Sequence, residues 1–262
     1  MSKNKKKYRC VLCHSYYKYS KMSEEHYPAK SVGNFDIVNF DLIKSIEFTI
    51  SPEINKIIQL RINKGERKDD VLSEIFDTHL ATDLYPKGRT SRSLCIKCNT
   101  FLGTYDESYK KFFMIDGNPQ KLKGFQEHTK LEIVKSIFGK FLSIPETKNE
   151  KFDFINFVKN IDETSYSGIW KIYFIKRNFS TDLLGYSDIR TGKLSYDEGV
   201  VYEMSDEKFI YNLMNFNKHS IYEMTSLFDI FSKNYKLIEG VGDDGGYHGQ
   251  LLITSLLNNT SN

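Results

Sequence analysis

The chain has 262 residues, a formal net charge of +3, 40% hydrophobic residues and 27% charged residues. This composition excludes a disordered or fibrous protein, and the lack of any run of about 18 apolar residues argues against a membrane span. The basic start leads directly to Cys10 without the apolar segment of a signal sequence, so we predict a cytoplasmic protein with one or two domains.

Residues 8–34 hold the first cysteine pair, Cys10 and Cys13, among β-prone tyrosines, and end in a turn signal at Gly33 and Asn34. We predict a zinc knuckle followed by a short hairpin. The segment is also basic, since Glu24 is one of only two acids between residues 3 and 30, against eight lysines and arginines. These cations are Lys3, Lys5, Lys6, Lys7, Arg9, Lys18, Lys21 and Lys30. They could neutralise phosphates, or the first of them could form a solvated tail.

Residues 35–93 are predicted to be a helical insertion. One helix opens at Ser51 and Pro52 and ends before Gly65, and a second opens at Asp69 and Asp70. After Cys95 the apolar spacing predicts a helix that runs to about Met114, and a further amphipathic helix is expected over residues 126–142.

The rest of the chain mixes predicted helices at 152–158, 208–216 and 221–231 with predicted strands at 169–175, 199–203 and 250–256. The run 242–249 combines two carboxylates, His248 and four glycines, which suits either a site or a tight loop. We therefore expect an α+β protein with a zinc-knuckle domain at 1–145 and a mixed α/β C-terminal domain at 146–262, for target recognition or partner binding.

All four cysteines lie in C-x-x-C pairs, Cys10 with Cys13 and Cys95 with Cys98. In a reducing compartment this spacing favours a tetrahedral zinc site over disulfides. A redox pair and unrelated core cysteines are the alternatives.

Three motifs combine around these cysteines: C-V-L-C at Cys10, S-E-E-H-Y-P-A-K at Ser23 and L-C-I-K-C-N-T-F-L-G at Leu94. Together they resemble the HNH endonucleases, the ββα-metal nucleases, in the form whose fold is held by a four-cysteine zinc. The resemblance covers about a quarter of the chain, in two blocks, and implies a ββα-metal core.

The resemblance implies roles for individual residues. His26 would be the general base that activates water, while Glu25 and Asn99 would bind a catalytic Mg²⁺ or Mn²⁺ through oxygen. Arg89 and Arg92, just before the second cysteine pair, and Lys30 in the basic segment would contact substrate phosphates.

Each role has a plainer alternative. Glu25 could be a solvated turn carboxylate, His26 could pack on Tyr27 or cap a turn, and Asn99 could cap its helix. The arginines could belong to an exposed basic strand. Asp106 could be an accessory acid beside the ion or a solvated helix carboxylate.

A middle asparagine is usual in the family shortly before the second cysteine pair, and residues 89–94 contain none. Its bracing role is therefore unfilled, or passes to Asn34 or to a hydroxyl.

The sequence thus predicts a metal-dependent endonuclease that hydrolyses phosphodiester bonds in DNA, in restriction or phage defence. The alternative is a non-catalytic zinc-stabilised module that binds nucleic acid or protein. RNA remains open as a substrate, and cutting of both strands would need a homodimer or two nicking events.

Overall fold

The structure is a computed structural model that describes residues 6–35, 37–40, 47, 50–75, 78–79, 81–85, 87–119, 126–177, 191–216 and 224–239. The chain divides into two compact units, one formed by Met1–Asn34 with Arg89–Asn262 and the other by Phe35–Gly88. The protein is α+β, as predicted.

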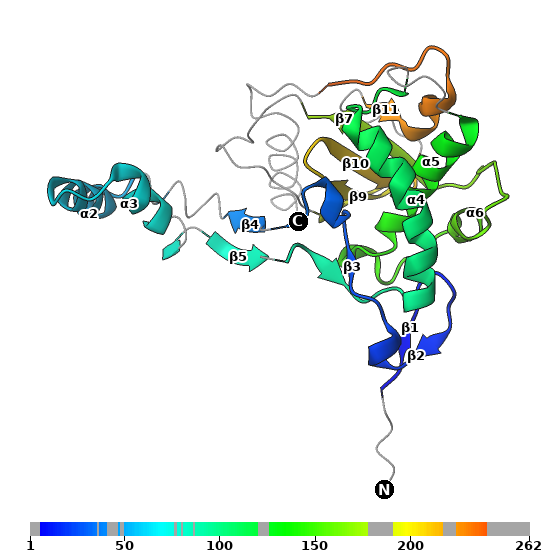
Figure 1. The fold of residues 1–262 in the computed structure, drawn as a ribbon, viewed down its shortest axis with the longest axis horizontal. Coiled ribbons are helices and arrows are strands. Elements are labelled where there is room, and N and C mark those ends of the chain that lie inside the picture. Colours follow the sequence, from blue (N-terminus) through cyan, green and yellow to red (C-terminus); the bar gives the residue numbers. More distant parts are fainter. Residues whose placement is uncertain are drawn as a thin grey trace, which may run out of the picture. The chain divides into compact units, whose positions relative to one another are not determined.

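A five-stranded antiparallel sheet forms the centre of the first unit, in the order β11-β7-β10-β9-β8 (Figure 1). Its strands are β7 (Lys171–Lys176), β8 (Thr191–Tyr196), β9 (Gly199–Ser205), β10 (Phe209–Met214) and β11 (Thr225–Ser226). Every residue of β10 is buried. Because successive side chains point to opposite faces, this strand is covered on both sides.

Two helices, α4 (Ile96–Met114) and α5 (Glu127–Phe141), pack together on one face of this sheet (Figure 1). The Phe112 ring of α4 stacks on Phe209 with 5.5 Å between ring centroids. The short helix α6 (Ile155–Lys159) follows the 3₁₀ turn η5 (Pro145–Thr147), and Phe138 of α5 packs on Phe154 just before α6. The helices predicted after Cys95 and over 126–142 are confirmed.

The N-terminal segment forms short strands near the N-terminal end of α4. Strands β1 (Tyr8–Arg9) and β2 (Tyr16–Tyr17) pair around the first cysteine pair, and the 3₁₀ turn η1 (Tyr19–Lys21) follows. Strand β3 (Glu25–His26) then pairs with β6 (Thr90–Ser91), which directly precedes α4. The 3₁₀ turn η2 (Lys30–Val32) leads into Gly33, whose φ of 97° suits glycine.

The described elements of the second unit include a two-stranded ribbon and the helices α2 (Pro52–Asn63) and α3 (Lys68–Ile75). The strands of the ribbon are β4 (Ile37–Phe40) and β5 (Ala81–Tyr85). Arg61 of α2 forms ion pairs with Glu66 and with Glu74 of α3. Both helices were predicted, although α2 buries no residue and α3 buries only Val71 and Ile75 among those described.

Several sequence predictions were wrong. The predicted helix at 208–216 is strand β10 (Phe209–Met214), because a short and mostly apolar segment carries no periodicity that separates helix from strand. The predicted helix at 221–231 is, where described, strand β11 and the 3₁₀ turn η6 (Leu227–Phe231). Within residues 14–35, all of which are described, the hairpin expected after the knuckle does not form, because β3 pairs with the distant β6. Strands β4, β5 and β8 were not predicted, and the runs 242–249 and 250–256 lie outside the described residues.

The division of the chain at Phe35–Gly88 lies within the first predicted domain, 1–145, where the insertion 35–93 was expected. Buried residues from Cys10 to Tyr235, on both sides of the predicted boundary at residue 145, form one hydrophobic cluster. None of the described helices is long and apolar enough to cross a membrane.

Candidate metal centre

The four cysteines come together as predicted. Their sulfur atoms all lie within 4.8 Å of one another, and Cys10, Cys95 and Cys98 are buried. A tetrahedral zinc with bonds of about 2.3 Å needs sulfurs roughly 3.8 Å apart, so this donor set fits the ion. Among the described residues, no other group of three or more Cys, His, Asp or Glu side chains gathers in this way.

Backbone geometry explains why the first pair presents both sulfurs to one point. The His14 backbone N–H donates to the Cys10 carbonyl at 2.9 Å, and His14 adopts a positive φ of 61° to close the turn. The His14 ring lies 2.9 Å from the Arg9 guanidinium and is exposed, so it does not join the cluster.

The sulfurs differ in their surroundings. Burial raises the pKa of Cys10 and of Cys98. Burial also raises the pKa of Cys13, but hydrogen bonds from the Ser15 backbone and the Tyr17 hydroxyl outweigh it and bring this pKa to about 6. A bound zinc would have to displace protons from the buried thiols.

An antiparallel ladder brings the two motif blocks together. Met22 pairs with Cys95, the Ser23 N–H donates to the Leu94 carbonyl at 2.8 Å, and Glu25 and His26 pair with Ser91 and Thr90. Strand β3, strand β6 and helix α4 therefore form a β-β-α arrangement whose two halves are far apart in the sequence.

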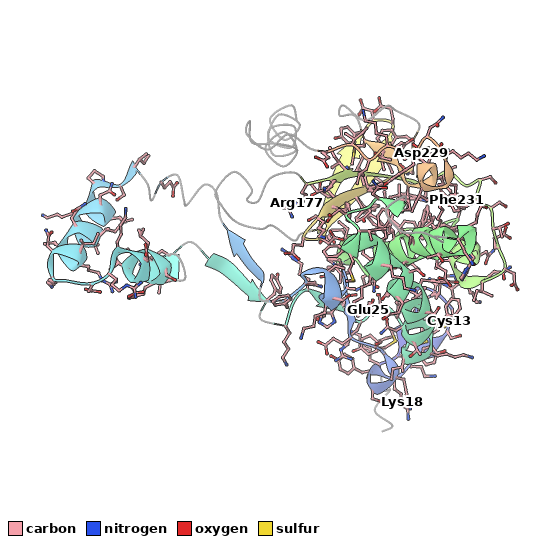
Figure 2. The ribbon with its side chains drawn as sticks, turned by 45° about the horizontal axis from the view of Figure 1, so that its top comes forward. Cys13, Lys18, Glu25, Arg177, Asp229 and Phe231 are labelled. Atoms are coloured by element: carbon pink, nitrogen blue, oxygen red, sulfur yellow. The ribbon has the colours of Figure 1, made fainter. Side chains whose placement is uncertain are left out.

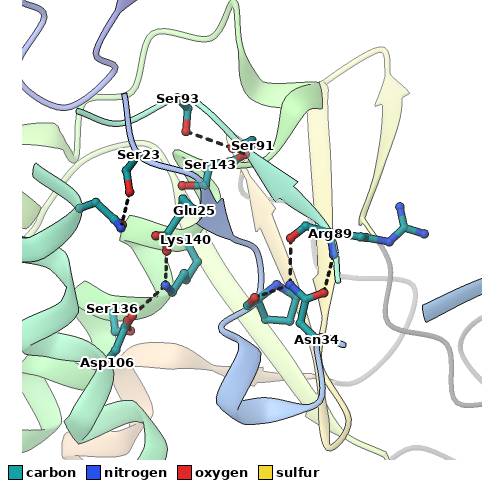
Figure 3. Close-up of polar contacts among 12 residues, drawn as sticks. Ser23, Glu25, Asn34, Arg89, Ser91, Ser93, Asp106, Ser136, Lys140 and Ser143 are labelled. Carbon is teal, nitrogen blue, oxygen red and sulfur yellow. Dashed lines mark hydrogen bonds and ion pairs between the residues drawn. The ribbon is translucent and has the colours of Figure 1, made fainter. Parts of the chain in front are cut away.

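Glu25 is buried, with 7% of its surface exposed, so it is not a solvated turn carboxylate. Its Oε1 forms an ion pair with Lys140 Nζ of α5, and Lys140 also lies 2.8 Å from Asp106 Oδ2 of α4 (Figure 3). The Ser136 hydroxyl donates to Asp106 Oδ1 at 2.8 Å. Glu25 Oε2 makes no hydrogen bond to a described residue. Lys140 was not predicted as a partner of Glu25. The sequence placed it only on the helix expected over residues 126–142.

Asn99 lies in the first turn of α4, near β3. Its amide nitrogen donates to the Ser23 hydroxyl at 2.8 Å, two residues before Glu25. The N-cap of α4 is Cys95, so Asn99 does not cap the helix. Within the described part of the chain, its Oδ1 makes no hydrogen bond. His26, the neighbour of Glu25 on β3, is half-buried.

Asn34 braces the chain that follows His26. Its side chain is fully buried, and its amide nitrogen donates to the carbonyls of Pro28 at 2.6 Å and Arg89 at 3.0 Å. Its Oδ1 accepts from the Arg89 backbone N–H at 2.7 Å (Figure 3). The insertion Phe35–Gly88 begins and ends next to this contact, so Asn34 closes its base.

The predicted phosphate-contacting residues have different surroundings. Arg92 donates to Glu24 Oε2 at 3.0 Å and to the Met22 carbonyl at 3.1 Å, and stacks on the Tyr19 ring at 4.6 Å. Arg89 contacts Asn34 through its backbone, and Lys30 is exposed on η2.

The knuckle surface combines cations with exposed aromatic rings. Residues 6–21 contain five lysines and arginines and no acid. Tyr16 and Tyr19 are 64% and 55% exposed. Figure 2 shows Cys13 and Lys18 at this end of the unit, away from Asp229 at the sheet end.

Comparison with protein family models, with curated proteins and with solved structures gives no match.

Proposed function

We propose that the protein is a metal-dependent endonuclease of the HNH type that hydrolyses phosphodiester bonds in DNA, with a structural zinc in the four-cysteine cluster. The observation that carries the proposal is the antiparallel pairing of β3, which holds Glu25 and His26, with β6 before α4. Asn99 of α4 donates to Ser23, two residues before Glu25, although 72 residues lie between His26 and Asn99. Many zinc modules without catalytic activity also have four clustered cysteines. The assignment of a nuclease therefore depends more on Glu25, His26 and Asn99.

The oxygen atoms suit a hard divalent cation. Glu25 Oε2 and Asn99 Oδ1 are a carboxylate and an amide oxygen, the ligand types that Mg²⁺ and Mn²⁺ prefer, and neither makes a hydrogen bond within the described residues. When bound, such an ion would polarise the scissile phosphate and stabilise the leaving 3′ oxygen.

His26 supplies the base. Imidazole has an unperturbed pKa close to neutral, so it can accept a proton from water while the water oxygen bonds to phosphorus and the P–O3′ bond breaks. Asn34 holds the loop after His26 against Arg89, which is the bracing role that residues 89–94 leave unfilled.

The basic knuckle surface fits the proposed substrate. Five cations without an acid between residues 6 and 21 would attract a phosphate backbone, and Tyr16 and Tyr19 could stack on unpaired bases. Single-stranded RNA is therefore an alternative substrate.

One observation favours a second candidate function, a zinc-stabilised module that binds nucleic acid without cutting it. The Glu25 carboxylate already pairs with the Lys140 ammonium, which neutralises part of the charge that a cation needs. Such a module would bind DNA and leave it intact.

Supercoiled plasmid incubated with Mg²⁺, Mn²⁺ or EDTA separates the two functions. The nuclease should relax the plasmid with either metal ion and not with EDTA, whereas the module should only shift it on a gel. His26→Ala should abolish nicking while zinc content and circular dichroism stay unchanged.

His128→Ala is the matched control, because His128 is an exposed histidine on α5 that pairs with Glu132. It should nick like the wild type. Equal nicking by His26→Ala would contradict the assignment of the base, and a wild type that binds plasmid but never relaxes it would favour the binding module.

A further inference from the structure

We propose that Lys140 is a positioning residue for Glu25, which holds one carboxylate oxygen and directs the other toward a divalent cation. The inference rests on the proposed function, because it gives one of its metal ligands a specific support. Lys140 itself would touch neither substrate nor ion.

Three elements build the support. Lys140 of α5 pairs with Glu25 Oε1 of β3 and with Asp106 Oδ2 of α4 at 2.8 Å (Figure 3). Ser136, one turn before Lys140 on α5, donates to the other Asp106 oxygen at 2.8 Å. Asp106 thus has both oxygens engaged, whereas Glu25 has only Oε1 engaged among the described residues.

Burial makes this support necessary. The side chains of Lys140 and Glu25 are only 8% and 9% exposed, and an unpaired buried carboxylate would be protonated or would turn toward solvent.

The charge balance leaves room for a cation. Glu25, Asp106 and Lys140 together carry one net negative charge when ionised, and the unengaged oxygen belongs to Glu25. A residue that orients a metal ligand in this way typically contributes about 10- to 100-fold to metal affinity or activity. The alternative is that the Lys140 ammonium competes with the ion for Glu25, in which case it would weaken ion binding.

The test measures Mn²⁺ binding to the full-length, zinc-loaded protein by calorimetry and by electron paramagnetic resonance of free Mn²⁺. Lys140→Met should raise the Kd for Mn²⁺ roughly 10- to 100-fold. The matched control is Lys135→Met, since Lys135 is also a buried lysine of α5 but donates to the Asn160 and Ile161 carbonyls at 2.6 and 3.1 Å. It should leave the Kd unchanged.

A second variant covers the case in which Lys140→Met does not fold. Ser136→Ala removes the hydroxyl that holds Asp106 and should weaken Mn²⁺ binding by a smaller factor. Lys140→Arg, which keeps the charge, should restore part of the affinity.

The outcomes separate this inference from the proposed function. An unchanged or lower Kd in folded Lys140→Met, with a wild type that nicks DNA, would overturn the positioning role alone. The same holds if Lys140→Met does not fold and Ser136→Ala binds Mn²⁺ like the wild type. A wild type that neither binds Mn²⁺ nor nicks DNA would overturn both.

Discussion

Two buried carboxylates of this protein have opposite surroundings. Glu25 on β3 gives one oxygen to Lys140 and keeps the other unengaged among described residues. Asp206, in the turn between β9 and β10, has both oxygens engaged: Oδ1 accepts from the backbone N–H groups of Lys208 and Phe209 at 2.9 and 2.8 Å, and Oδ2 accepts from the Tyr109 hydroxyl.

The difference separates a candidate site from a structural contact. The Asp206 oxygens serve the hairpin and the packing of Tyr109 against the sheet, so no acceptor is left for a ligand. The region around Glu25 is instead assembled from distant segments and leaves ligand-type oxygens available. Different substitutions and conditions should therefore disturb the region around Glu25 and the region around Asp206.

The largest effect is expected for Cys95→Ser. Loss of one of the four thiolates should abolish zinc binding. The effect on stability should be large, because a structural zinc contributes about 10–16 kcal/mol to small metal-dependent folds. Mass spectrometry should find no bound zinc, and hydrogen exchange should lose protection in β3 and β6 before it does in β9 and β10.

Ser15→Ala is the control for this experiment, since Ser15 is an exposed knuckle residue that contacts Cys10 and Cys13 through backbone groups, which the substitution keeps. It should keep its zinc. Full zinc content in Cys95→Ser would show that the four sulfurs do not act as one site.

Asn34→Ala should have the next largest effect. The substitution removes three hydrogen bonds, one to the buried Pro28 carbonyl and two to the backbone of Arg89. The free energy of unfolding should fall by roughly 3 kcal/mol, measured by urea denaturation, and nicking should be lost with it.

Asn156→Ala, at an exposed position on α6, is the control and should change stability by less than about 0.5 kcal/mol. A fall of that small size in Asn34→Ala would remove Asn34 from the bracing role.

The smallest effect concerns the Asp206 region and depends on pH. Burial raises the Asp206 pKa to about 6 from its usual 3.8, although the Tyr109 hydroxyl and two backbone N–H groups act in the other direction. Between about pH 4 and 6 the folded protein therefore binds more protons than the unfolded chain. The contribution of Asp206 is fully present below pH 4 and is lost as pH rises through 6.

Asp206→Asn removes this titration. Relative to the variant, the wild type should lose about 2 kcal/mol of unfolding free energy from pH 4 to 6, measured by denaturation at each pH. Parallel pH curves for the two proteins would contradict the assigned shift.

The sequence predicted the features that depend on local spacing. Two C-x-x-C pairs bring four thiols to one point, and the apolar period after Cys95 gave helix α4 to its last residue, Met114. Ser51 and Pro52 marked the start of α2 correctly. These signals are local because capping, helical period and thiolate chemistry act within a few residues.

Only the tertiary structure decided which distant residues meet. No pattern shows that Lys140, on a helix more than a hundred residues after Glu25, would pair with it, or that Asn34 would hold Arg89 across the insertion. Strand β10 was predicted as a helix because burial on both faces erases periodicity. The sequence by itself thus determined the four-cysteine cluster that could hold a metal, and it named the candidate catalytic residues. The packing of α4 and α5 decided the surroundings of Glu25, because burial and charge pairing arise only between segments.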